Sequence, residues 1–372
     1  MGKTNRIKNY KSIEFDSLLL FSVVTLIIIG IVMVFSSSAI IAQERYSNMY
    51  YFMFRQFLWV LISTGALYMG YKINYNVWAR LSRVGIFFVL FILAAVLFPF
   101  LGHSVSGARR WIRFGPIGFQ PAEMAKLTVI IYMSSVLDRK YTKIKNFSRD
   151  LLPPLIVLFF IMMLIYLQPD FGTSIFIVFA VGGMLFLGGI KARYLIASGL
   201  LMTPFFVYAV LSHGYRVKRF LSFMHPFDNI RESSFQLAQS LVALGDGGLT
   251  GVGIGRGFQK LFFIPEVHTD FIYSIIGQEM GLIGTLGVLV MFLLFTWRGV
   301  KISLQSKEYL AKIMAAGITF LISAQALINI GVVTGCLPTT GLSLPFISFG
   351  GSSLFFNMLA VGIILNISQK AN

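Results

Sequence analysis

Four acidic residues border long apolar runs in this sequence: Glu123, Asp170, Asp270 and Glu279. Ionisable groups at membrane depth are costly, so those that occur there usually serve a function. A carboxylate at the boundary between water and membrane could act as a general base on a hydroxyl nucleophile. Asp270 has that position if the apolar run after it crosses a membrane. Glu279 would lie about 13 Å deeper along a helix.

Two of these acids also have a simple explanation as helix caps. Asp170 follows Pro169 in YLQPDFGTS, where it could cap a helix that begins near Phe171. Asp270 is the last residue but one of PEVHTDF, and an apolar run begins directly after it. It could therefore be an N-cap, or an acid near the positive end of a helix. Position alone favours the structural explanation for both residues.

Glu123 lies three residues before Lys126 in QPAEMAKL. On a helix that starts after Pro121, the two side chains would share one face and neutralise each other. Buried charges are normally paired for structural reasons as well as functional ones. A structural ion pair and a pair that lines a substrate cavity are therefore equally open.

Two groups of cations are candidates for binding an anion, because they lie in loops expected outside the membrane, where basic residues are normally sparse. These groups are Arg109, Arg110 and Arg113, and Arg216, Lys218 and Arg219. His268 and Thr269, directly before Asp270, are also candidates for contact with a substrate. The histidines are scattered without metal-ligand spacing and Cys336 is the only cysteine, so the sequence identifies no metal site.

Two stretches are rich in glycine. The run GDGGLTGVGIGRG, Gly245–Gly257, is preceded by no strand and followed by no GK[ST], which argues against a nucleotide loop. We expect a close-packed, turn-rich segment that uses glycine's access to positive φ. FISFGGSS, Phe346–Ser353, falls inside the last apolar run, where Gly and Ser normally allow close helix packing. Its Ser352 and Ser353 are also candidates for binding substrate.

The composition is that of a membrane protein. Hydrophobic residues make up 56% of the chain and charged residues only 12%. We expect an all-α polytopic fold of about ten transmembrane helices in a single membrane domain, 1–372. The expected spans are 17–40, 52–71, 84–101, 120–137, 151–168, 171–189, 193–211, 271–297, 309–336 and 344–367.

The basic residues predict the orientation of these spans. Most of them fall in alternate loops, on the side that also holds the N-terminal segment 1–16, so both termini are expected in the cytoplasm. A long loop between the seventh and eighth spans, 212–270, is then external. Loops of this length in compact proteins are usually functional. The net charge is +17, but the basic residues lie between the apolar spans and not on one polar face, so nucleic acid is not an expected partner.

The motifs GARRWIRFG, FQPAEMAKL, QPDFGTS, PEVHTDF and TGCLPTTGLSLPFISFGGSS resemble those of the SEDS family, in order and over nearly the whole chain. The regions FQLAQS and PEVHTDF look more like FtsW or its sporulation relative SpoVE than RodA. Thr340 departs from the lysine that many FtsW sequences have at this position, so division, sporulation and elongation all remain open.

This resemblance implies a peptidoglycan glycosyltransferase of the bacterial inner membrane that polymerises lipid II on the external face. Asp270 matches the family's essential aspartate. The implied partners are lipid II, the nascent glycan strand, membrane lipid, a class B penicillin-binding protein and other division or elongation proteins. No cofactor is expected to be tightly bound, although Mg²⁺ or Mn²⁺ could help to offset the charge of a pyrophosphate.

Two alternatives remain from the sequence. A lipid II flippase could use the same charged residues, and the deeper position of Glu279 fits a translocation path. A scaffold that only recruits a penicillin-binding protein would leave the external carboxylates dispensable.

Overall fold

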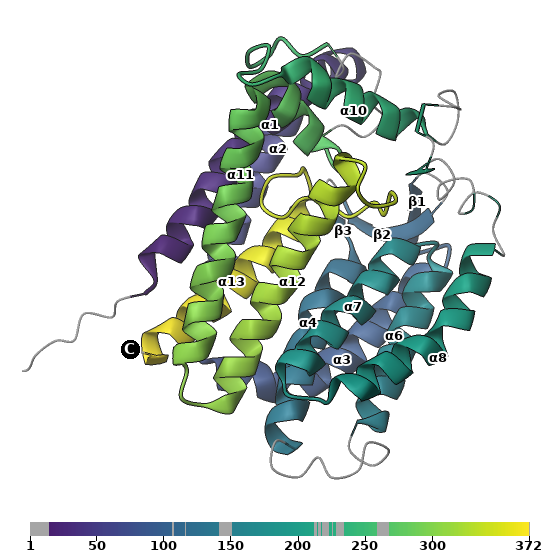
Figure 1. Ribbon diagram of the computed structural model, residues 1–372, viewed down its shortest axis with the longest axis vertical. Helices are drawn as coiled ribbons and strands as arrows, with labels where there is room; N and C mark the ends of the chain where they lie inside the picture. The colour runs from purple at the N-terminus through teal and green to yellow at the C-terminus, as the bar shows by residue number, and fades with distance from the viewer. Residues whose placement is uncertain are drawn as a thin grey trace, which may run out of the picture.

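The computed structural model consists mostly of helices that run between two ends of the molecule (Figure 1). It describes residues 15–105, 108–115, 117–140, 151–211, 234–258 and 268–371, and positions 214, 217, 223, 224, 226 and 227. Within these residues, six helices are long and apolar enough to cross a membrane. They are α1 (Ser17–Tyr46), α2 (Tyr51–Lys72), α3 (Tyr75–Leu97), α11 (Ile272–Gln305), α12 (Tyr309–Val333) and α13 (Gly351–Ala371).

Four further helices coincide with the remaining apolar runs. They are α4 (Pro121–Lys140), α6 (Leu152–Leu167), α7 (Phe171–Leu187) and α8 (Ala192–Leu211). Of these, α6 and α7 are apolar but shorter than a typical span. The mostly helical architecture is confirmed, whereas the count of ten crossings stays a prediction.

Helix α12 joins two groups of helices (Figure 1). It packs against α11 and α13 in one group and against α4 and α7 in the other. Helix α13 also packs along α2, where glycines make the contact close. A Cβ on Gly70 would lie 2.5 Å from the carbonyl oxygen of Leu359, and one on Gly362 would lie 2.2 Å from that of Leu67. Small residues at such contacts are typical of membrane helices.

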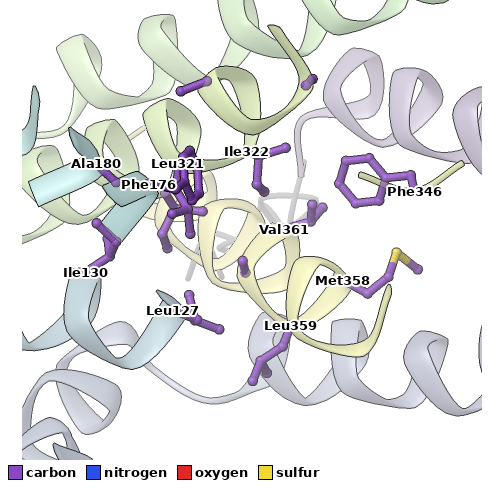
Figure 2. Packing of buried hydrophobic residues seen from close by; sticks show 14 of the residues in the cluster. Leu127, Ile130, Phe176, Ala180, Leu321, Ile322, Phe346, Met358, Leu359 and Val361 are labelled. Atoms are coloured by element: carbon purple, nitrogen blue, oxygen red, sulfur yellow. The ribbon is translucent and has the colours of Figure 1, made fainter. Parts of the chain in front are cut away.

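The core takes residues from most of the helices, and one part of it lies where α4, α7, α12 and α13 meet (Figure 2). The most apolar stretch of α13 is 89% buried, against 22% for α2, so α13 is central and α2 peripheral. Figure 2 shows the side chains that converge there, among them Leu127, Ile130, Phe176, Ala180, Leu321, Ile322 and Val361.

The all-α prediction is wrong for the segment between α3 and α4. A three-stranded antiparallel sheet occupies it, formed by β1 (Gly102–Val105), β2 (Ala108–Phe114) and β3 (Ile117–Phe119). Strand β2 alternates between the buried Ala108 and Ile112 and the exposed Arg109 and Arg113, which is the period of a half-buried strand. Helix α3 therefore ends at Leu97, before the end of the expected span 84–101.

The prediction for the last span, 344–367, is wrong at its start. Helix α13 begins at Gly351, and α12 ends at Val333. The residues between them, 334–350, form a non-helical loop that we call the site loop. Pro338 and Pro345 cannot continue a helix, and Gly341 has a φ of 75°.

The expected long loop 212–270 contains a helix of its own, α10 (Phe235–Gly247). It lies at the opposite end of the molecule from the start of α1 and the end of α13 (Figure 1). After α10 the glycine-rich run forms turns, with positive φ at Gly248, Gly251, Gly253 and Gly255, which confirms its predicted character. The positions of the termini relative to the cytoplasm stay a prediction.

Candidate active site

The site loop lies against the segment that carries Asp270. From α12, the side-chain amide of Asn329 donates to the carbonyl oxygens of Asp270, at 2.8 Å, and of Leu342, at 2.7 Å. A Cβ built on Gly341 would lie 3.6 Å from Oδ2 of Asp270. The half-buried carboxylate therefore lies beside the bare backbone of a glycine, at the start of α11.

Two more bonds fix the backbone just before Asp270. The Ser348 hydroxyl donates to the carbonyl oxygen of Thr269 at 2.5 Å, and the Phe349 amide donates to that of His268 at 2.9 Å. The His268 ring packs against Phe52, at 4.7 Å between centroids, and Phe349, at 5.6 Å. His268 and Thr269 thus help to fix the position of Asp270 through their main chain.

The interpretation of Asp270 as an N-cap is wrong. The N-cap residue of α11 is Phe271, and no side chain caps the helix there. Asp270 lies one residue earlier, where the positive end of the helix still stabilises its negative charge. The carboxylate of Asp270 is therefore near the N-terminus of α11 without being its cap.

Asp170, in contrast, is the helix cap that the sequence predicts. Its Oδ1 accepts from the Thr173 amide at 3.3 Å, at the N-terminus of α7. Its Oδ2 lies 3.8 Å from Nη1 of Arg110 on β2. A Cβ on Gly172 would lie 2.2 Å from the carbonyl oxygen of Thr340, so the first turn of α7, which Asp170 caps, borders the site loop.

The neighbouring arginines of β2 have different surroundings. Arg110 faces Asp170 and is partly buried, whereas Arg109 is exposed. Successive side chains of a strand point to opposite faces, so the two cannot approach one anion equally. Of the two, Arg110 is the one that lies beside Asp170, at the start of α7. Arg216 and Lys218, the other predicted cations, lie outside the described residues.

Glu123 and Lys126 form a buried ion pair, with 2.8 Å between Oε1 and Nζ. Lys126 also donates to Oε1 of Gln325 at 2.7 Å, and the Gln325 amide donates to the Ser343 carbonyl at 2.8 Å. The ion pair that the sequence predicts is therefore present, and it reaches the site loop through Gln325.

Ser352 and Ser353 have separate contacts at the start of α13. Ser352 accepts from the Gln120 amide at 3.0 Å and donates to the Gly118 carbonyl at 3.2 Å, which joins α13 to β3. The hydroxyl of Ser353 lies 3.4 Å from that of Ser343 in the site loop. Packing is therefore the better-supported role for Ser352, and Ser353 is the serine closer to the candidate site.

The sequence reasoning missed Gln325 and Asn329, the two amides of α12 that hold the site loop. They are four residues apart in an apolar run, so they lie on one helix face. Two amides at that spacing in a membrane span are the signal that could have found them. Across the described part of the chain, no three His, Cys, Asp or Glu residues are grouped to hold a metal ion.

A family model described as "Cell cycle protein", for FtsW, RodA and SpoVE, matches residues 16–372. The chain belongs to this family. The predicted SEDS membership is thereby confirmed, and the match extends over the site loop, β2 and the segment of Asp270 alike.

Curated relatives of this family are similar over almost their full length. The probable peptidoglycan glycosyltransferase FtsW of Geobacter sulfurreducens is 39% identical over 363 residues, which cover 97% of each chain. Stage V sporulation protein E of Bacillus subtilis is 38% identical over 354 residues, covering 95% of this chain and 97% of the relative. The predicted similarity to FtsW and SpoVE is confirmed.

Two solved structures have the same fold. One is a chain from a peptidoglycan synthase complex, with a TM-score of 0.77 at 24% identity, covering 96% of this chain and 98% of the other. The second is the rod shape determining protein RodA of Thermus thermophilus, with a TM-score of 0.71 at 23% identity and coverage of 97% and 98%. The helical SEDS fold described above is therefore shared with RodA.

Proposed function

We propose that this protein is a peptidoglycan glycosyltransferase that polymerises lipid II into glycan strands. The observation that carries the proposal is the position of Asp270. Its main chain is held by Asn329, its neighbours are held by Ser348 and Phe349, and its carboxylate lies half-buried beside Gly341. The activity named for the FtsW relatives supports the same conclusion.

In the proposed reaction, Asp270 acts as general base on the 4-hydroxyl of the acceptor sugar. As the proton of this hydroxyl passes to the Asp270 carboxylate, the hydroxyl oxygen attacks the anomeric carbon of the growing chain, and a C–O bond forms. The bond from that carbon to the undecaprenyl-pyrophosphate oxygen breaks, and the electron pair leaves with the pyrophosphate. Attack from the opposite face converts an α-linked donor into a β-1,4 product. Because the leaving group is already activated, no second carboxylate is needed as an acid.

Cations must offset the charge that develops on the pyrophosphate. Arg110 is the best-placed candidate among the described cations, because it is partly exposed and lies beside Asp170 at the start of α7, where Gly172 contacts the site loop. Lys126 is 3% exposed and bonded to both Glu123 and Gln325, so its proposed part is to hold the loop. Arg109, Arg216 and Lys218 would attract the substrate from outside the membrane. Mg²⁺ or Mn²⁺ could share this task, bound to the pyrophosphate oxygens and one or two carboxylates.

The proposal also includes orientation and partners. Charge bias in the sequence supports cytoplasmic termini, which would put Asp270 and α10 on the external face. The structural match to a chain of a peptidoglycan synthase complex supports work with a partner. A class B penicillin-binding protein with a single membrane anchor would crosslink the strands as they form, during division, sporulation or elongation.

A polymerisation assay tests this function. Purified protein is incubated with labelled lipid II and Mg²⁺ or Mn²⁺, with and without the cognate penicillin-binding protein carrying an inactive transpeptidase. We expect glycan polymer from the wild type and none from Asp270→Ala, with partner binding retained. Equal polymer from both proteins would contradict the role of Asp270. If no polymer forms under any condition, the proposal is wrong, and a flippase or a scaffold becomes the favoured function.

A further inference from the structure

Helix α11 is interrupted close to its start. Gly281 has a φ of 65° and a ψ of −162°, which are not helical values. In a continuous α-helix, the amide of Leu282 would donate to the carbonyl of Gln278. The amide of Ile283 would likewise donate to the carbonyl of Glu279. Neither arrangement occurs, so four backbone groups need other partners inside an apolar helix.

All four groups bond to one segment of the glycine-rich run, residues 248–255, which we call the glycine turn. Two amides of the turn donate to α11, and two carbonyls of the turn accept from it. The amides of Val252 and Gly253 donate to the carbonyls of Gln278 and Glu279, each at 3.0 Å, and the carbonyls of Gly248 and Leu249 accept from Leu282 and Ile283 at 3.0 and 3.2 Å. The turn is thus inserted into the hydrogen-bond ladder of the helix.

Glycine is required on both sides of this contact. A Cβ on Gly251 would lie 2.2 Å from the carbonyl oxygen of Glu279, and one on Gly281 would lie 2.4 Å from the amide nitrogen of Gly251. Real Cβ atoms do not approach that closely, and both residues have positive φ. The sequence therefore specifies the insertion at two separate places in the chain.

The side chain of Glu279 stabilises the insertion through its hydrogen bonds to Ser36 and Gly255, which we call the lock. It is 1% exposed, and its two carboxylate oxygens lie 2.7 and 2.6 Å from the hydroxyl of Ser36 on α1. Oε2 also accepts from the Gly255 amide, in the glycine turn, at 3.0 Å. Hydrogen bonds to an ionised carboxylate are stronger than those between neutral groups. One buried side chain therefore holds α1, the glycine turn and α11 together.

We propose that Glu279 is a positioning residue for Asp270, because it keeps the glycine turn inserted in α11. Only the short helical piece 272–280 separates Asp270 from the break, so the angle at Gly281 sets where the carboxylate meets Gly341. Without the lock, the glycine turn leaves α11. The amides of Leu282 and Ile283 then donate within the helix, to the carbonyls of Gln278 and Glu279. The helix then straightens, and Asp270 leaves its place beside the site loop. This inference rests on the proposed function of Asp270 and assigns Glu279 a part in it.

A distance measurement tests the lock without any need for activity. In a Cys336→Ser background, nitroxide labels are placed at Ile254→Cys in the turn and Val290→Cys on α11, both exposed positions. We expect one narrow distance in this reference protein by electron spin resonance. Glu279→Ala should add a second distance or broaden the first, and Glu279→Gln should restore the reference, because its amide oxygen still accepts from Gly255.

Glu44→Ala is the matched control, since Glu44 is exposed on α1 and should leave the distance unchanged. If Glu279→Ala folds and keeps the reference distance, the proposal is wrong. If it does not fold, Ser36→Ala, which removes only one partner of the carboxylate, decides instead. A broadened distance supports the lock, and an unchanged one overturns it.

Kinetics form the second arm of the test. A lost positioning residue should lower kcat for lipid II polymerisation by about 10- to 100-fold and change KM by less than about threefold. Glu279→Gln should recover most of kcat. An unchanged kcat in a variant whose distance has broadened would overturn the link to Asp270. If the reference protein makes no polymer, the proposed function fails, while the distances still decide whether the lock exists.

Discussion

Asp270 and Glu123 are both acids connected to the site loop by hydrogen bonds, but they are held in different ways. Glu123 is held through its side chain, by a buried ion pair with Lys126 that continues to Gln325. The segment of Asp270 is held through its main chain, by bonds from Asn329, Ser348 and Phe349. Bonds to the backbone fix the position of Asp270 whichever side chain it carries, whereas the bonds of Glu123 depend on its carboxylate. Variants at the two places should therefore affect different properties.

The largest effect on stability is expected from Lys126→Met. It leaves the Glu123 carboxylate buried without its cation, which should lower the free energy of unfolding by about 3–5 kcal/mol. Chemical denaturation in detergent micelles measures this loss. The double variant with Glu123→Gln should recover a large part of it, because no isolated charge then remains. Equal stability of the wild type and the single variant would show that the pair does not support the fold.

Asn329→Ala should mainly reduce activity. The variant loses the amide bonds to Asp270 and Leu342, so we expect polymerisation to fall by about 10- to 100-fold through misplacement of the carboxylate. The free energy of unfolding should fall by only about 1–3 kcal/mol.

Asn366 provides the matched control for Asn329. It also makes two bonds to the backbone, with Tyr71 and Tyr75, but at the opposite end of the molecule. Asn366→Ala should cost similar stability and leave polymerisation within about threefold of the wild type. Similar activity losses in the two variants would argue against a special role for Asn329.

A smaller effect is expected for Arg110→Gln, which removes the cation beside Asp170. KM for lipid II should rise about tenfold, with little change in thermal stability, if Arg110 contacts the pyrophosphate. Steady-state kinetics of polymerisation measure this change. Arg109→Gln is the matched control, because it makes the same substitution on the opposite face of β2. A larger rise in KM for the control would reverse the assignment of the two arginines.

The smallest effect is expected at the far end of α4, where burial and the negative charge of Glu308 raise the pKa of the Asp138 carboxyl, against a backbone bond from Leu310. A raised pKa in the folded state stabilises the protein at acidic pH, and that stabilisation is lost as the pH rises through the raised value. Asp138→Asn keeps an acceptor for Leu310 and removes the charge. Its thermal midpoint should rise slightly above the wild-type value, more at pH 8 than at acidic pH. If the thermal midpoint of Asp138→Asn at pH 8 is below that of the wild type, the pKa of Asp138 is not raised by folding.

Much of the fold could be predicted because membrane helices are encoded locally, as apolar runs of sufficient length. The sheet 102–119 escaped prediction because alternation over a few residues of β2 is a weak signal beside long apolar runs. The start of α13 was misplaced because Phe346 and Ile347 are apolar, although they belong to a loop rather than to a helix.

The candidate site was predictable only in part. Asp270, Asp170 and the Glu123 and Lys126 pair could be identified as ionisable residues in an apolar chain. Their common neighbour, the site loop, could not be identified, because its contacts join residues far apart in the sequence. The insertion of the glycine turn into α11 is another long-range contact, visible in the sequence only as glycines at both places.

The most direct test of the account compares Asp270→Asn with the wild type in two measurements on the same preparation. Asn has the size of Asp and leaves the bonds from Asn329, Ser348 and Phe349 to the main chain in place, so the thermal unfolding midpoint should stay within about 2 °C of the wild-type value. Polymerisation of lipid II should fall by about 10²- to 10⁴-fold, as expected for loss of a general base. Activity that survives this substitution, or a variant that unfolds, would contradict the claim that Asp270 is held by its backbone for chemistry.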